Sequence, residues 1–137
     1  MSVLLDTSAI LAAADMDDLN HAAAVAWLDR LDEPLLVGVL TLAEAEHVLR
    51  RELGPAASSA LVRSVVEGSV GLVAPTERDL GRALELIDEA AEHRPGLAEA
   101  ALVAAAERLG VVRVATFERR SIAVFRPRHV RALDLEP

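Results

Sequence analysis

The feature that most constrains the fold is a repeated alternation of short, fully apolar runs with longer segments of helical periodicity. Apolar runs bounded by turn-forming residues predict buried strands, and apolar residues spaced three or four apart predict amphipathic helices. Strands that are apolar on both faces and alternate with helices are typical of a covered parallel sheet. The sequence therefore predicts an α/β fold, a three-layer α/β/α sandwich around a short central parallel sheet.

The same pattern places the individual elements. We expect strands at residues 2–6, 35–39, 70–74 and 111–117, with a further short strand towards residue 135. We expect helices at residues 18–31, 41–53, 56–67, 76–92 and 97–109, and one more that starts near residue 7 with Thr7 or Ser8 as its cap. In the helix over 76–92, Thr76 is the expected cap, Asp79 follows three residues on, and the apolar stripe is Leu80, Leu84, Ile87 and Ala91. No repeat or linker interrupts the pattern, so a single domain over residues 1–137 is expected.

Charge and cysteine content limit the kinds of chemistry. The chain has 22 acidic and 14 basic residues, a formal net charge of -8, no lysine and no cysteine. An acidic chain does not attract nucleic acid through its overall field, so RNA binding would need a local arginine surface or metal ions. The lack of cysteine excludes disulfides, thiolate nucleophiles and zinc–sulfur sites. Because no long apolar span or signal-like N-terminus is present, we expect a cytoplasmic protein without a membrane segment.

Three carboxylates occupy informative positions. Asp6 and Glu118 directly follow predicted strands, and ligands of open parallel sheets bind beyond the carboxyl ends of the strands. Glu99 is the only polar residue in the segment 97–106, in a helix that offers it no polar face. A carboxylate in such surroundings is normally protonated, paired with a cationic side chain or bound to a metal ion. An arginine partner and a metal ion both satisfy this requirement for Glu99.

The segment LTLAEAEHVL supplies a fourth acid, either Glu44 or Glu46. On a helical wheel, Glu46 lies nearer the apolar stripe of Leu42 and Leu49, so periodicity favours Glu46 as the inward acid. The start of this helix is uncertain by a residue or two, and the periodicity leaves both residues open.

Carboxylates that converge without histidine or cysteine form an all-oxygen site, which selects Mg²⁺ or Mn²⁺. Such ions bind phosphate groups and activate water. The sequence contains no serine–histidine arrangement, Walker loop or glycine-rich dinucleotide motif. Phosphohydrolases of the haloacid-dehalogenase type and receiver domains also place an aspartate after the first strand, but both need a lysine that this chain lacks. The sequence therefore favours metal-assisted hydrolysis of phosphate esters.

Four segments resemble motifs of the PIN-domain family, specifically of its VapC toxins: LLDTSAILAAAD, TLAEAEHVLRRELG, GLAEAALVAAAERLG and VATFERRSIAVFRPRH. The resemblance implies that Asp6, Glu44, Glu99 and Glu118 hold Mg²⁺, with Mn²⁺ as the other possible ion. It assigns the second acid to Glu44 and not to Glu46. It implies a type II toxin, an endoribonuclease in which a metal-activated water cleaves RNA. Ser8 and Thr116 would orient the ligands or waters.

The resemblance also implies partners. These are an RNA substrate, a second copy of the chain, and a VapB-like antitoxin whose tail occupies the acidic cleft. The apolar segments 12–31 and 56–66 are candidate contact surfaces. The arginines expected to contact RNA phosphates are Arg50, Arg51, Arg119 and Arg120.

One departure from the family leaves an alternative open. The family generally has aspartate where this chain has Glu99 and Glu118. The longer side chain keeps the charge but alters the reach, and Mg²⁺ demands near-ideal octahedral geometry. The alternative is a catalytically weakened PIN domain that binds antitoxin or RNA without cleaving efficiently.

Overall fold

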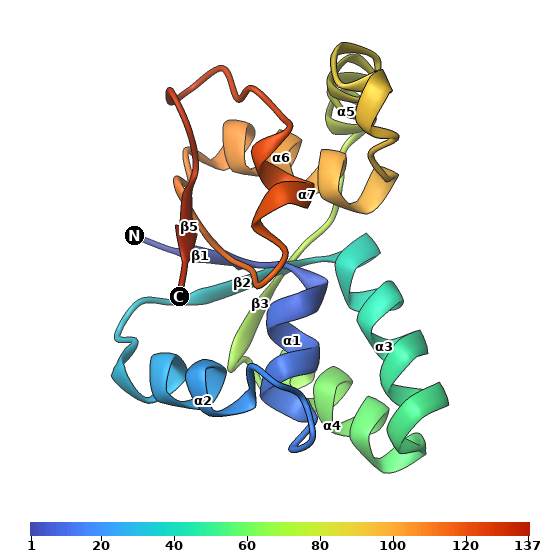
Figure 1. Cartoon of the computed structure of the whole chain (residues 1–137), viewed down its shortest axis with the longest axis vertical. Coiled ribbons are helices and arrows are strands. Elements are labelled where there is room, and N and C mark those ends of the chain that lie inside the picture. Colours follow the sequence, from blue (N-terminus) through green and yellow to red (C-terminus); the bar gives the residue numbers. More distant parts are fainter.

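Five short strands form one sheet in the order β3–β2–β1–β4–β5 in the computed structural model, which describes all residues 1–137 (Figure 1). The strands are β1 Val3–Leu5, β2 Leu35–Gly38, β3 Val70–Val73, β4 Arg113–Ala115 and β5 Asp134–Glu136. Every neighbouring pair is parallel. The predicted α/β class with a central parallel sheet is confirmed, including the strand expected near residue 135.

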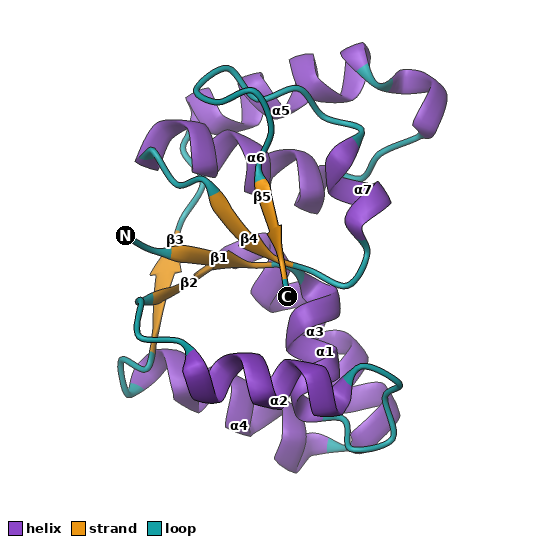
Figure 2. Ribbon diagram, turned by 60° about the vertical axis from the view of Figure 1, so that its left-hand side comes forward, coloured by secondary structure: helices purple, strands orange, loops and turns teal.

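Helices cover both faces of the sheet (Figure 2). On one face lie α1 Thr7–Ala14, α2 His21–Arg30, α3 Val39–Leu53 and α4 Pro55–Val66. On the other lie α5 Glu77–Glu89, the 3-10 helix η1 Ala91–His93, α6 Leu97–Leu109 and α7 Arg119–Ala123. None of these helices has the length and apolar character needed to span a membrane.

Strand β1 shows why three layers form. Its side chains alternate in direction, so Leu4 joins the apolar cluster built with α5 and α6, whereas Val3 and Leu5 join the cluster built with α1 and α3. All three are buried, as a continuously apolar strand predicts. The sheet is therefore held between two apolar layers, and β1 lies at its centre.

Several boundaries differ from the sequence expectations. Helix α2 begins at His21 and not at residue 18, because Asp15 and Asp18 accept hydrogen bonds from backbone N–H groups two residues on, at 2.9 and 2.7 Å. Such bonds stabilise turns in competition with a helix. The expected strand over 111–117 is shortened to β4, and the short helix α7 after it was not predicted. The N-cap of α1 is Asp6, not Thr7 or Ser8.

Helix α5 confirms one expectation and contradicts another. Thr76 and Asp79 form the expected reciprocal cap, with bonds of 3.0 and 3.1 Å. The apolar stripe was wrong, because Leu80 and Leu84 are 38% and 61% exposed while α5 buries Ala83 and Leu86 instead.

Ion pairs with α6 explain this orientation of α5. Asp79 pairs with Arg108 at 2.9 Å, and Arg82 pairs with Glu107 at 2.9 Å. Asp79 and Arg82 therefore share with Ala83 and Leu86 the side of α5 that faces α6, and Leu80 and Leu84 turn outward.

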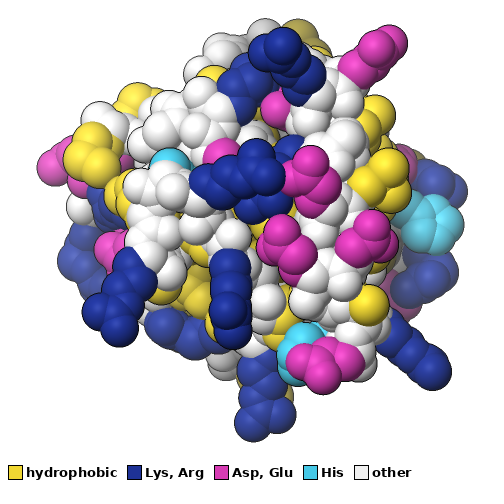
Figure 3. Space-filling model, turned by 90° about the horizontal axis from the view of Figure 1, so that it is seen from above, with side chains coloured by type: hydrophobic (Ala, Val, Ile, Leu, Met, Phe, Trp, Pro, Cys, Tyr) yellow, Lys and Arg dark blue, Asp and Glu magenta, His cyan; other side chains and the backbone are white.

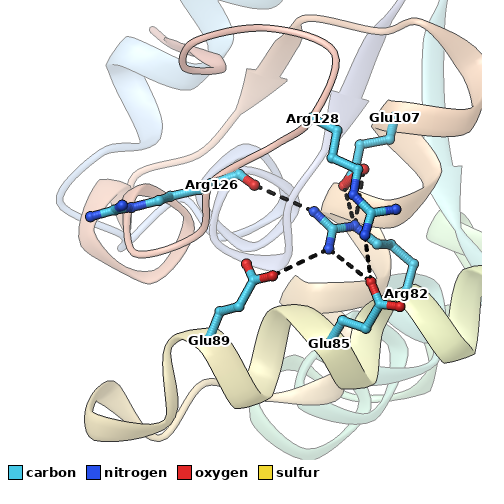
Figure 4. A network of polar contacts seen from close by, with 6 residues as sticks. All are labelled: Arg82, Glu85, Glu89, Glu107, Arg126 and Arg128. Carbon is cyan, nitrogen blue, oxygen red and sulfur yellow. Dashed lines mark hydrogen bonds and ion pairs between the residues drawn. The ribbon is translucent and has the colours of Figure 1, made fainter.

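The guanidinium of Arg82 also holds the segment that precedes β5. Besides Glu107 it contacts Glu85 at 3.1 Å, Glu89 at 3.6 Å and the carbonyl oxygen of Arg126 at 3.5 Å (Figure 4).

Arginine and acidic side chains are interspersed on the surface seen from above (Figure 3). This face therefore does not present a field of one sign.

Candidate active site

The candidate site begins where β1 runs into α1. Asp6 is 6% exposed, and its backbone N–H donates to the Ala115 carbonyl of β4 at 2.9 Å. Its side-chain Oδ2 accepts hydrogen bonds from the hydroxyls of Thr116 at 2.8 Å and Ser8 at 3.2 Å. The hydroxyls thus fix the carboxylate through one oxygen and leave Oδ1 free of hydrogen bonds to the protein.

The two hydroxyls also join the loop after β4 to the loop after β1. Thr116 is fully buried and its Oγ1 lies 3.1 Å from Ser8 Oγ. The backbone N–H of Phe117 donates to Ser8 Oγ at 2.9 Å, and that of Glu118 donates to Thr116 Oγ1 at 3.0 Å. The position of Glu118, at the start of α7, is therefore coupled to that of Asp6.

Glu99 lies in the first turn of α6 and is half-buried. Burial, and then the negative charges of Glu44, Asp6 and Glu118, raise the pKa of its carboxyl, while a hydrogen bond from its own backbone acts in the opposite direction. The four acids therefore lie close enough to interact, although they come from four different segments.

Gly96 makes room for the Glu99 carboxylate. A Cβ atom at position 96 would lie 2.6 Å from Glu99 Oε2. This role of Gly96 was missed from the sequence, where the only signal is a glycine immediately before a helix.

Glu44 and Glu46 of α3 differ in their contacts. Glu46 pairs with Arg50 of its own helix at 3.0 Å and is the less exposed of the two, as periodicity favours. Glu44 forms no ion pair, and it is the acid of α3 whose charge acts on Glu99. The more buried acid of α3 is therefore not the one whose charge acts on Glu99.

The donors suit a hard divalent cation in charge and chemistry. None of Asp6, Glu44, Glu99 and Glu118 forms an ion pair with arginine or histidine, so the expected alternative of an arginine partner for Glu99 is not found. All the side chains offer oxygen ligands, which Mg²⁺ and Mn²⁺ prefer. As they lie, no three acidic or histidine side chains are arranged to hold an ion. Ligation therefore requires the glutamate side chains to turn towards Asp6.

Most of the arginines predicted to contact RNA have other partners. Arg50 and Arg51 pair with Glu46 and Glu52, and Arg119 donates to the carbonyl oxygen of Pro137. Arg120 has no such partner, and it lines a cleft that Glu99 also lines.

The main apolar hollow lies elsewhere. A cavity of about 390 Å³ is lined mostly by hydrophobic side chains of α1, α2 and α4, among them Ile10, Trp27 and Leu61. None of the four acids lines it. Both segments predicted as contact surfaces, 12–31 and 56–66, contribute to its walls.

Comparison with known proteins agrees with this fold. The PIN domain family model matches residues 3–126. Ribonuclease VapC26 of Mycobacterium tuberculosis is 28% identical over 125 residues, which is 91% of this chain and 93% of the relative.

Several solved structures have the same fold as this chain. VapC20 of Mycobacterium tuberculosis, described as a sarcin–ricin loop cleaving toxin, matches with a TM-score of 0.83 and 20% identity over 94% of this chain and 98% of its own. VapBC2 of Rickettsia felis, solved with a promoter DNA fragment, matches with a TM-score of 0.66 and 13% identity over 99% and 98%. The resemblance seen in the four sequence segments is confirmed, and the chain belongs to the PIN-domain family.

Proposed function

We propose that this protein is a metal-dependent endoribonuclease, the toxin of a type II toxin–antitoxin pair, and that residues 1–137 form its one domain. The observation that carries the proposal is the group of four acids without cationic partners at the carboxyl edge of β1 and β4. The similarity to ribonuclease VapC26 supports RNA as the substrate. A cysteine-free chain that acts on RNA is expected to work in the cytoplasm.

In this proposal Asp6, Glu44, Glu99 and Glu118 hold Mg²⁺ or Mn²⁺. When bound, the ion activates water and offsets charge on the phosphoryl oxygens. The protein contributes orientation, because Thr116 and Ser8 hold Asp6 through Oδ2 and leave Oδ1 for the ion.

The test combines calorimetric titration with Mg²⁺ and Mn²⁺ and cleavage of total RNA by antitoxin-free protein. We expect Asp6→Asn to lose both metal binding and cleavage. Glu46→Gln is the matched control, because it removes a nearby acid that pairs with Arg50 and stands outside the group. A folded wild-type protein that binds no metal and cuts no RNA would support the alternative, a PIN domain that only binds.

The antitoxin is proposed to insert an apolar segment into the cavity between α1, α2 and α4. An apolar hollow of this size fits a protein segment better than RNA, and the similar Rickettsia structure contains VapBC2. Ala60 lines the cavity and is exposed, so Ala60→Trp fills the space with little strain. We expect this variant to keep its nuclease activity but to escape inhibition by the antitoxin. Unchanged inhibition would exclude the cavity.

A homodimer is proposed to form over the exposed leucines of α5 and α6. Leu84 and Leu97 are 61% and 46% exposed, which leaves apolar area for a second copy to cover. We expect Leu84→Asp to shift the wild-type dimer to monomer in sedimentation velocity. A variant that stays dimeric would place the interface elsewhere.

A further inference from the structure

A second cleft adjoins the acidic group. It measures about 290 Å³ and lies between the turn before α6 and helix α7. Glu99 and Gly96 line it from the start of α6, and Arg120 and Ser121 line it from α7. Glu99 therefore belongs both to the acidic group and to this cleft.

Two arginines give the cleft its charge. Arg94 lines it from the turn after η1, and Arg120 lines it from α7. Neither side chain forms an ion pair or a hydrogen bond within the protein. Other arginines of this chain also lack a partner, so the lack alone marks no site. These two are distinguished because they share one cleft beside a group of carboxylates.

The backbone at Arg94 has an unusual conformation. Its φ of 50° and ψ of 52° lie in the left-handed region, and no other residue except glycine has a positive φ. This conformation is unfavourable for an L-residue with a long side chain, and glycine would adopt it freely. The protein therefore holds an arginine, at a conformational cost, where it contributes its charge to the cleft.

We infer that Arg94 and Arg120 bind a phosphate group of the RNA strand next to the phosphate that is cut, an inference that rests on the proposed nuclease function. Four carboxylates repel a polyanion, and two cations on one side of them offset this repulsion. A guanidinium matches the geometry of phosphate oxygens and stays charged at every working pH. The start of α6 adds the partial positive charge of a helix N-terminus. The strand is thereby bound at a fixed distance from the metal ligands.

Equilibrium binding of a short, fluorescent, single-stranded RNA tests this inference. Ca²⁺ replaces Mg²⁺ in this assay so that the strand stays intact. We expect Arg94→Ala and Arg120→Ala each to weaken binding roughly tenfold, as the loss of a charge-assisted hydrogen bond does. Each should also reduce the slope of log affinity against log salt by about 0.7, the value for one phosphate contact on a single strand.

Two further variants separate charge from fold. Arg94→Gly suits the left-handed backbone, so it should retain wild-type thermal stability and still lose binding. Arg30→Ala on α2 removes an exposed arginine that has no ion pair and does not line this cleft, and we expect it to bind like wild type.

The outcomes are distinguishable. Weakened binding and a lower salt slope in the cleft variants alone support the inference. If the wild type cleaves RNA and the cleft variants match the Arg30 control, the inference is wrong and the proposed nuclease stands. If the folded wild type neither binds nor cleaves RNA, both are wrong.

Discussion

The hydroxyl of Thr116 allows the sharpest test of the site. We predict that Thr116→Val lowers the free energy of unfolding of the metal-free protein by about 2 kcal/mol, within the range for a hydrogen bond to a charged group. The hydroxyl is fully buried and donates to Asp6 at 2.8 Å, so its loss removes the shorter of the two bonds to that carboxylate. The Glu118 N–H also loses its acceptor, which acts in the same direction.

The same substitution should reduce RNA cleavage about 10- to 100-fold, as removal of a group that orients a metal ligand does. Urea unfolding is followed by the fluorescence of Trp27, the single tryptophan of the chain. Thr41→Val is the matched control, because Thr41 is 2% exposed and its hydroxyl makes no hydrogen bond. If both variants unfold at the same urea concentration as wild type, the Thr116 hydroxyl does not hold Asp6 and the reasoning fails.

Three more predictions concern stability. The raised pKa of Glu99 means that the folded protein holds this proton to higher pH than the unfolded chain, so metal-free protein loses stability as pH rises through the folded pKa. Glu99→Gln should remove this loss and unfold at higher urea concentration at neutral pH, whereas a lower midpoint would contradict it. Glu136 has a lowered pKa because Arg113 binds it at 2.7 Å. The stability that this ion pair adds to the folded protein is therefore lost as pH falls through that pKa. Glu136→Gln should cost about 1 kcal/mol at neutral pH, since the pair is partly solvated, and equal pH profiles of variant and wild type would refute this. Thr76→Ala removes the cap that Asp79 completes and should cost about 1 kcal/mol, measured by urea unfolding against Ser59→Ala as an exposed control without a side-chain bond.

The sheet could be predicted because its signal is local. Each strand is a short apolar run, and burial on both faces requires no knowledge of its neighbours. The position of Asp6 followed from the same signal, since it ends the first run. The short helix α7 could not be found this way, because five residues show less than two turns of periodicity.

The orientation of α5 depends on distant partners. Its leucines form a regular stripe, yet Arg82 and Asp79 lie against α6, where Glu107 and Arg108 neutralise them. These ion pairs join residues 25 to 29 positions apart, and helical periodicity contains no information about them.

The acid of α3 illustrates the same limit. Periodicity ranks Glu46 as more buried, which is correct. The other acids of the group lie on other elements, and the periodicity of α3 contains no information about them. The family resemblance, rather than the wheel, pointed to Glu44.

The bond between Thr116 and Asp6 spans 110 positions of the chain. Such long-range contacts form late in folding, because a large loop must close before they contribute. During synthesis the ribosome releases Asp6 early, but β4 and the loop that follows it emerge near the end. A nascent chain therefore carries Asp6 and Ser8 without the Thr116 hydroxyl and without Glu118. The acidic group therefore cannot assemble until almost the whole chain has left the ribosome.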